Sequence, residues 1–206
     1  MKGADMFWDN ISGIYGAFED IYNGDVNRKV SKTVASYLDG QDTVLELACG
    51  TGMITKCAAP ACKKLVATDF SVGMLKQAED SCFGLTNVLF RKADIMNIKC
   101  RDERFDKIIA GNVIHLLDDA EGAVREMDRV CKKGGMLIIP TYINESESGG
   151  QSIFTQMVSK AGADFKRQFT LESYKQFFAD LGYEDTEFTF IEGRVPCAVA
   201  AIRKPL

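Results

Sequence analysis

Short apolar runs and helical periods alternate along most of the chain. Five runs have the length of a buried strand, and they cover residues 43–48, 65–68, 88–90, 105–110 and 136–139. Between them, apolar residues recur every three or four positions, as they do on one face of a helix. Strands that alternate with helices in this way form a parallel sheet with helices on both faces. The pattern therefore predicts an α/β domain.

The two ends of the chain depart from this alternation. Residues 8–22 have an aromatic-rich helical period, and a second helical pattern follows a predicted turn at 23–25 and continues to Leu38. Near the other end, two further strand-like runs, 187–191 and 198–202, are joined by a short turn-like segment. Because the connection is short, we expect these two strands to pair antiparallel.

The chain has 206 residues, a length that suits one domain with one sizeable core. Two more helical patterns, at 151–162 and 170–181, follow a polar loop after the fifth run. We expect one domain, 1–206, and divide it into a helical cap (1–40), a core (41–140), an insertion (141–182) and closing strands (183–206).

Composition and charge exclude several classes of protein. The net charge of −4 argues against a broad basic surface for nucleic acid. No apolar stretch approaches the ~18 residues of a membrane span, and the N-terminus lacks the apolar block of a signal peptide. The seven cysteines form no C-x-x-C pair, so we expect neither a disulfide framework nor a metal site. These features predict a cytoplasmic protein.

A glycine loop follows the first apolar run. Gly50 and Gly52 separate this strand from a helical segment, an arrangement that brings bare backbone close to a ligand at a helix N-terminus. Thr55 stands where the dinucleotide fingerprint has its third glycine, which weakens a nicotinamide interpretation. Asp69 ends the second run and Asp94 follows the third, so both carboxylates belong to the same edge of the sheet.

Five segments together resemble the motifs of class I S-adenosylmethionine-dependent methyltransferases. They are residues 46–52 (ELACGTG), 68–75 (TDFSVGML), 93–95 (ADI), 105–116 (FDKIIAGNVIHL) and 132–137 (KKGGML). The resemblance implies a Rossmann-like, doubly wound, seven-stranded sheet that is mostly parallel with an antiparallel last strand, preceded by a helical cap. It also implies that S-adenosylmethionine lies along the carboxyl edge of the sheet.

The resemblance further implies roles for individual residues. Glu46 would lie near the methionine moiety, Asp69 would hold the ribose, and Asp94 with Ile95 would border the adenine. Phe70 and Met74 would pack against the adenosine or belong to the core. The full set of expected cofactor-binding residues is Tyr15, Glu46, Ala48, Cys49, Gly50, Gly52, Asp69, Phe70, Met74, Asp94, Ile95 and Asn112.

Methyl transfer from a sulfonium requires proximity and alignment more than acid–base chemistry. His115, the only histidine, follows the fourth run and is a candidate general base, with packing against the cofactor loop as the alternative. We expect a small-molecule acceptor, apolar or aromatic, that enters between residues 6–24 and 141–182. The sequence does not specify an oligomeric state.

Two other functions stay open at this point. A nicotinamide-dependent oxidoreductase also uses a Gly-x-Gly loop and a ribose-binding acid, but the missing third glycine and the antiparallel closing pair disfavour it. A module that binds S-adenosylmethionine without catalysis is the other alternative, because methyl transfer needs no obligatory catalytic side chain.

Overall fold

The computed structural model describes residues 2–144 and 166–206, apart from the side chains of residues 2–7, 10 and 14–20. Two predictions lie outside this description. They are the helix expected over 151–162 and the side chain of Tyr15.

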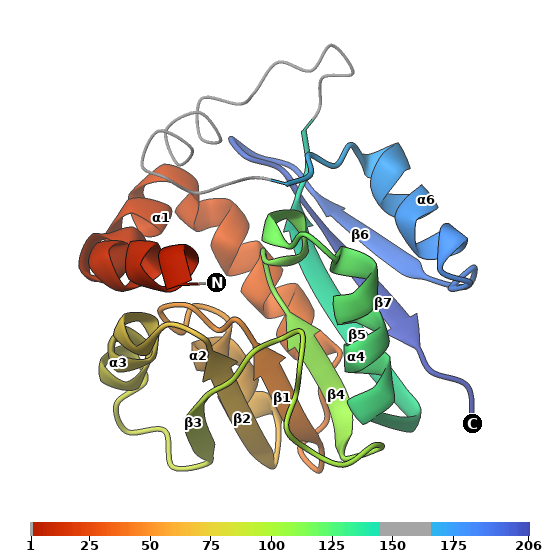
Figure 1. Ribbon diagram of the computed structural model, residues 1–206, viewed down its shortest axis with the longest axis horizontal. Coiled ribbons are helices and arrows are strands. Elements are labelled where there is room, and N and C mark those ends of the chain that lie inside the picture. The colour runs from red at the N-terminus through yellow and green to blue at the C-terminus, as the bar shows by residue number, and fades with distance from the viewer. Residues whose placement is uncertain (1, 145–165) are drawn as a thin grey trace.

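Seven strands form one sheet (Figure 1). They are β1 (Thr43–Leu47), β2 (Lys64–Asp69), β3 (Val88–Lys92), β4 (Phe105–Ala110), β5 (Cys131–Tyr142), β6 (Glu187–Ile191) and β7 (Cys197–Arg203). Their order across the sheet is β3-β2-β1-β4-β5-β7-β6, and β7 runs antiparallel to both of its neighbours. The predicted fold class is confirmed, including the antiparallel last strand.

Helices cover both faces of the sheet. They are α1 (Lys2–Ser36), α2 (Thr55–Ala58), α3 (Val72–Ser81), α4 (Ala120–Val130) and α6 (Leu171–Asp180), with short 3-10 turns η1 (Ala59–Ala61) and η2 (Ile114–Leu116). One core lies between the sheet and the pair α4 and α6, where Tyr174 and Phe178 are fully buried. A second lies under the second half of α1, where Val30 and Val34 pack on the opposite face.

The turn predicted at 23–25 is a kink within the long helix α1. Asn23 has non-helical backbone angles (φ −137°, ψ 21°). Its side-chain amide donates to the Val195 carbonyl across 3.0 Å, and its Oδ1 accepts from the Val195 N–H across 3.2 Å. Asn23 therefore fastens the kink to the turn between β6 and β7. The helical period continues on both sides of that point.

Strand β5 is much longer than the predicted run of 136–139. It begins at Cys131, directly after α4, and pairs with β7 from Met136 to Tyr142. The partner strand supplies backbone hydrogen bonds to residues that the local apolar pattern does not mark as strand. Its length therefore depends on tertiary pairing.

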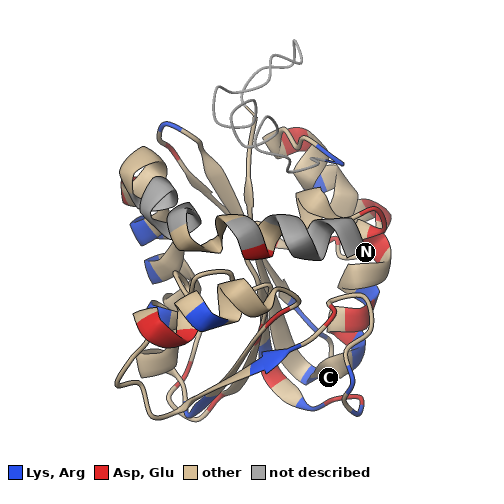
Figure 2. Ribbon diagram, turned by 60° about the vertical axis from the view of Figure 1, so that its left-hand side comes forward, with Lys and Arg blue, Asp and Glu red and all other residues tan. Residues whose placement is uncertain are grey.

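No helix in the part of the chain that the structure describes combines the length and the apolar character needed to cross a bilayer. Basic and acidic residues are interspersed over the elements visible in Figure 2. The cytoplasmic location stays a prediction.

Candidate functional site

The candidate site lies where the strand order reverses. Strand β1 is flanked by β2 on one side and by β4 on the other, and all three run parallel. Open parallel sheets bind ligands at such a switch point, outside the carboxyl ends of the strands. The first half of α1 and the N-terminal end of α3 face this edge (Figure 1).

The glycine loop after β1 uses its two glycines differently. Both have positive φ, 55° at Gly50 and 87° at Gly52. A Cβ on Gly52 would lie 2.9 Å from the Cys82 sulfur and 3.3 Å from the Ala78 Cα, so Gly52 lets the loop pack against α3. A Cβ on Gly50 would meet no atom within 4 Å, which leaves open space beside the backbone at that position.

Asp69 connects the glycine loop with the start of α3. Its Oδ2 accepts a hydrogen bond from the Gly50 N–H, and its Oδ1 accepts one from the Ser71 N–H, both across 2.9 Å. The residue is 5% exposed. Burial raises the pKa of Asp69, whereas the backbone N–H donors oppose that rise by stabilising the carboxylate. The structure thus brings the acid after the second strand into contact with the glycine loop.

Glu46 lies deeper beneath the same loop. The Thr55 hydroxyl donates to Glu46 Oε2 across 2.7 Å, and Glu46 is 1% exposed. Burial raises the pKa of Glu46 to about 8, and the neighbouring charge of Asp69 acts in the same direction. At neutral pH the carboxyl group is therefore largely protonated. Thr55, which in sequence marks only a missing glycine, is its hydrogen-bonding partner.

Two non-glycine residues in the left-handed region follow adjacent strands. Ala48 (φ 51°) comes after β1 and Asn112 (φ 51°) comes two residues after β4. Such backbone costs on the order of 1–3 kcal/mol and is concentrated at functional sites. The Asn112 N–H donates to the Pro140 carbonyl across 2.8 Å. The side-chain Oδ1 of Asn112 is buried and has no hydrogen-bond partner in the structure as described.

The other expected cofactor residues lie at the same edge but differ in exposure. Asp94 is half-buried, and its Oδ1 accepts from the Met96 N–H across 2.9 Å. Ile95 and Phe70 are also half-buried, whereas Met74 and Cys49 are buried at 2% and 7% exposure. Burial of Met74 agrees with either placement that the sequence allowed, in the core or against the adenosine, so its role stays a prediction.

His115 lies in the 3-10 turn η2 that follows β4. Its Nδ1 is 3.0 Å from the Thr141 hydroxyl, and the residue is 4% exposed. Burial lowers the pKa of His115 to about 4, so the imidazole is neutral at pH 7. The His115 carbonyl accepts hydrogen bonds from the N–H groups of Lys166 and Arg167.

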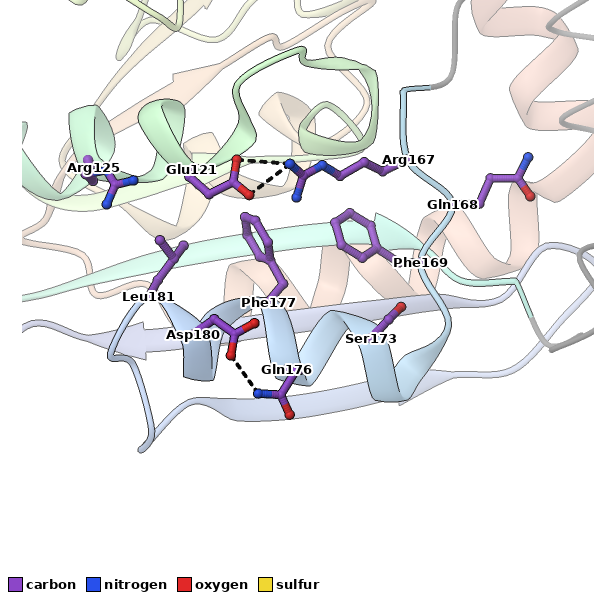
Figure 3. Close-up of a pocket in the computed structure, with 10 residues that line it drawn as sticks. All are labelled: Glu121, Arg125, Arg167, Gln168, Phe169, Ser173, Gln176, Phe177, Asp180 and Leu181. Carbon is purple, nitrogen blue, oxygen red and sulfur yellow. Dashed lines mark hydrogen bonds and ion pairs between the residues drawn. The ribbon is translucent and has the colours of Figure 1, made fainter.

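A hollow of about 760 Å³ lies between α4 and α6, beside the segment 166–169 (Figure 3). On its wall the Arg167 guanidinium binds both oxygens of Glu121, at 2.8 and 3.0 Å, and lies 5.5 Å from the centre of the Phe177 ring. This contact fastens segment 166–169 to α4. The sequence does not indicate this contact, because 46 residues separate the partners and neither belongs to a motif.

No group of three or more histidine, cysteine, aspartate or glutamate side chains in the described residues is arranged to hold a metal ion. The hydrogen bonds and backbone angles described above define a site made of the glycine loop, Asp69, Glu46 with Thr55, and the segment around Asn112.

Several solved structures share the fold of this chain. A SAM-dependent methyltransferase from Thermotoga maritima superposes with a TM-score of 0.71 at 21% identity, covering 97% of this chain and 99% of the other. The complex of DhpI with SAH superposes with a TM-score of 0.76 at 19% identity, covering 98% and 96%. The chain thus has the fold of these proteins.

Sequence comparison then gives the family. The profile described as a methyltransferase domain matches residues 45–139. Demethylmenaquinone methyltransferases match over most of this chain in Streptomyces griseus (28% identity, 77% of this chain, 68% of the relative) and in Renibacterium salmoninarum (24%, 92% and 87%). The match in Corynebacterium urealyticum is 32% identical over 58% of this chain and spans half of that relative. Residues 45–139 thus match a methyltransferase domain, and the relatives and the fold together support a class I S-adenosylmethionine-dependent methyltransferase, with S-adenosylmethionine as the methyl donor.

These matches confirm the resemblance to methyltransferases that the sequence motifs indicate, together with the predicted activity class and the predicted cofactor. The nicotinamide-dependent alternative and the non-catalytic alternative are not favoured, because the matched family and the named relatives are methyltransferases. The roles of individual site residues stay predictions.

Proposed function

We propose that this protein transfers the methyl group of S-adenosylmethionine to a small, largely apolar aromatic acceptor of the quinol class. The relatives named demethylmenaquinone methyltransferase support this acceptor class. The structural observation that supports S-adenosylmethionine binding is the Asn112 Oδ1 at the switch point, which is buried and accepts no hydrogen bond. A buried acceptor without a donor is unfavourable, and a ligand that brings a donor removes that cost.

The residues present fit S-adenosylmethionine. Its α-ammonium group is a donor suited to the Asn112 Oδ1, and the open space beside Gly50 allows close approach of a ligand to the backbone. Each Asp69 oxygen already accepts one backbone N–H and has a second lone pair for a ribose hydroxyl. Asp94 keeps an exposed face for the adenine.

The cofactor supplies an activated methyl group and a neutral leaving group, so the chain chiefly has to align donor and acceptor and exclude water. The Gly50–Asp69 and Glu46–Thr55 contacts hold the loop in place for this purpose. The neutral His115 imidazole can accept a proton only weakly at a pKa of about 4. We therefore assign His115 a positioning role through Thr141.

Two measurements test this function. S-adenosylhomocysteine should raise the melting temperature of the protein, and NAD should not. Asp69→Ala should lose most of this rise. Asp80→Ala is the control and should keep it, because Asp80 is an exposed acid on α3. Incubation with S-adenosylmethionine and a demethylated naphthoquinol should then give a methylated product by mass spectrometry. Stabilisation by NAD alone would overturn the methyltransferase proposal. Stabilisation by S-adenosylhomocysteine without turnover of quinols would overturn the acceptor class.

A further inference from the structure

The cap helix α1 is bonded to the N-terminus of α3 through a single carboxylate. Asp9 Oδ1 accepts a hydrogen bond from the Ser71 hydroxyl across 2.5 Å and another from the Gly73 N–H across 2.9 Å. These bonds lower the pKa of Asp9, so the side chain is ionised at neutral pH. A negative charge is also favourable at a helix N-terminus, where backbone N–H groups are unsatisfied.

The two helices touch at a glycine. A Cβ on Gly73 would lie 2.8 Å from the Ser12 hydroxyl oxygen and 3.0 Å from the Asp9 Cα. Any side chain at residue 73 would therefore clash with α1 in its present place. The absence of a Cβ therefore allows the backbone of α1 to reach the Asp9 hydrogen bonds.

The same contact continues into the cofactor site. Ser71, which is fully buried, donates its backbone N–H to Asp69 Oδ1, and Gly50 donates to the other oxygen of Asp69. A continuous series of hydrogen bonds thus runs from Asp9 on the cap, through Ser71 and Asp69, to the glycine loop.

We propose that Asp9 is a positioning residue that holds the cap helix against the cofactor edge and thereby sets the affinity for S-adenosylmethionine and S-adenosylhomocysteine. The proposal rests on the proposed function for the identity of the ligand. Asp9 acts through Ser71 and the position of α1, and it takes no part in the transfer itself.

Removal of the carboxylate provides the first test. Asp9→Ala should weaken S-adenosylhomocysteine binding by about three- to tenfold, since charge-assisted hydrogen bonds are lost, and leave kcat at saturating cofactor within about threefold. Asp9→Asn keeps an acceptor oxygen and should restore most of the affinity. Asp25→Ala is the matched control, because Asp25 is an exposed acid on the same helix whose ion pair, with Arg28, is local.

A pair of glycine substitutions tests the contact from the opposite helix. Gly73→Ala should push α1 away and reduce the affinity as Asp9→Ala does, although alanine favours the helix at that position. Gly13→Ala is its control, because a Cβ there meets nothing within 4 Å. Gly73→Ala and Gly13→Ala both retain the Asp9 charge. If Gly73→Ala nevertheless loses affinity as Asp9→Ala does, the effect comes from the contact between α1 and α3.

Trp8, the only tryptophan, precedes Asp9 and reports the position of the cap without any ligand. Acrylamide should quench Trp8 fluorescence more strongly in Asp9→Ala and Gly73→Ala than in the wild type or the controls. Unchanged quenching, or unchanged affinity despite increased quenching, would overturn the proposal. Failure of the wild type to bind S-adenosylhomocysteine would instead refute the proposed function, and the quenching experiment would still report on docking.

Discussion

The Thr55 hydroxyl donates a hydrogen bond to the Glu46 carboxyl group across 2.7 Å, beneath the glycine loop and out of reach of solvent. The two residues are nine positions apart, one at the end of β1 and the other at the start of α2. Their contact ties the loop to the strand before it and leaves a carboxyl group with a pKa of about 8 in the middle of the site.

Glu46 should make the ligand-free protein less stable as the pH rises. Its pKa of about 8 in the fold exceeds the ordinary 4.5, so the native state binds more protons than the unfolded state between these values. The free energy of unfolding should fall across that window, by at most ~1.4 kcal/mol per pH unit. Urea unfolding at pH 5, 6.5 and 8 should show a smaller fall in Glu46→Gln, with the raised pKa of Asp69 leaving a residual slope. Parallel slopes in both proteins would contradict the assignment.

His115 should act on stability in the opposite direction. Its pKa is about 4 in the fold against an ordinary 6.5, so the unfolded state binds more protons between these values and stability is lost as the pH falls through them. Urea unfolding of His115→Gln should show a weaker loss on acidification.

The same substitution separates positioning from general-base catalysis by His115. Removal of a general base typically costs ~10²–10⁴ in rate, whereas a positioning role predicts a loss of kcat below about tenfold. The dependence of kcat on pH should keep its shape in His115→Gln. A loss of a hundredfold or more, with normal S-adenosylhomocysteine binding, would restore the base role.

The Arg167–Glu121 pair should contribute about 0.5–1 kcal/mol to stability, because both side chains are roughly one-third exposed and one guanidinium nitrogen contacts both carboxylate oxygens. A double-mutant cycle with Arg167→Gln and Glu121→Gln measures this coupling. The Lys166–Asp118 pair is the control, since Asp118 is 86% exposed and its coupling should be smaller. Arg167→Gln and Glu121→Gln should each raise the KM for the acceptor while S-adenosylhomocysteine affinity stays unchanged. An equal loss of cofactor affinity would show that the Arg167–Glu121 pair affects the whole site.

Asn112→Gly should separate stability from binding. Glycine tolerates the positive φ and removes the unsatisfied buried oxygen, so the ligand-free protein should be as stable as the wild type or more stable by up to ~1 kcal/mol. S-adenosylhomocysteine affinity should nevertheless fall by about tenfold. Glu103→Gly is the matched control, because Glu103 is an exposed residue at φ 50° and should change stability alone. Unchanged affinity in Asn112→Gly would remove Asn112 from the cofactor site.

Much of the fold follows from local patterns. The strands at 43–47, 105–110 and 187–191 agree with the predicted runs, because buried strands require apolar residues at consecutive or alternate positions. Ser71 caps α3 through the Met74 N–H, as its place before an apolar stripe indicates. The position of the candidate site is also predictable, since parallel strands bring their carboxyl ends to one edge.

The partners of individual side chains depend on the tertiary structure. Asn23 bonds Val195 across 172 residues and turns an expected break into a kink, and β5 extends to Tyr142 because β7 pairs with it. The sequence gives no sign that Asp9 binds the N-terminus of α3, since neither helix specifies where the other lies.

The sequence by itself thus determined the order of helices and strands along the chain, the sheet edge at which the site lies and the resemblance to a methyltransferase family. These depend on periodicity, chain direction and short motifs, which are local properties. Only the tertiary structure decided that Glu46 is buried against Thr55, that His115 is neutral, and that Asp9 and Arg167 fasten distant segments around the site. Burial and hydrogen-bonding partners set these properties, and both arise from residues brought together by the packing of the whole chain.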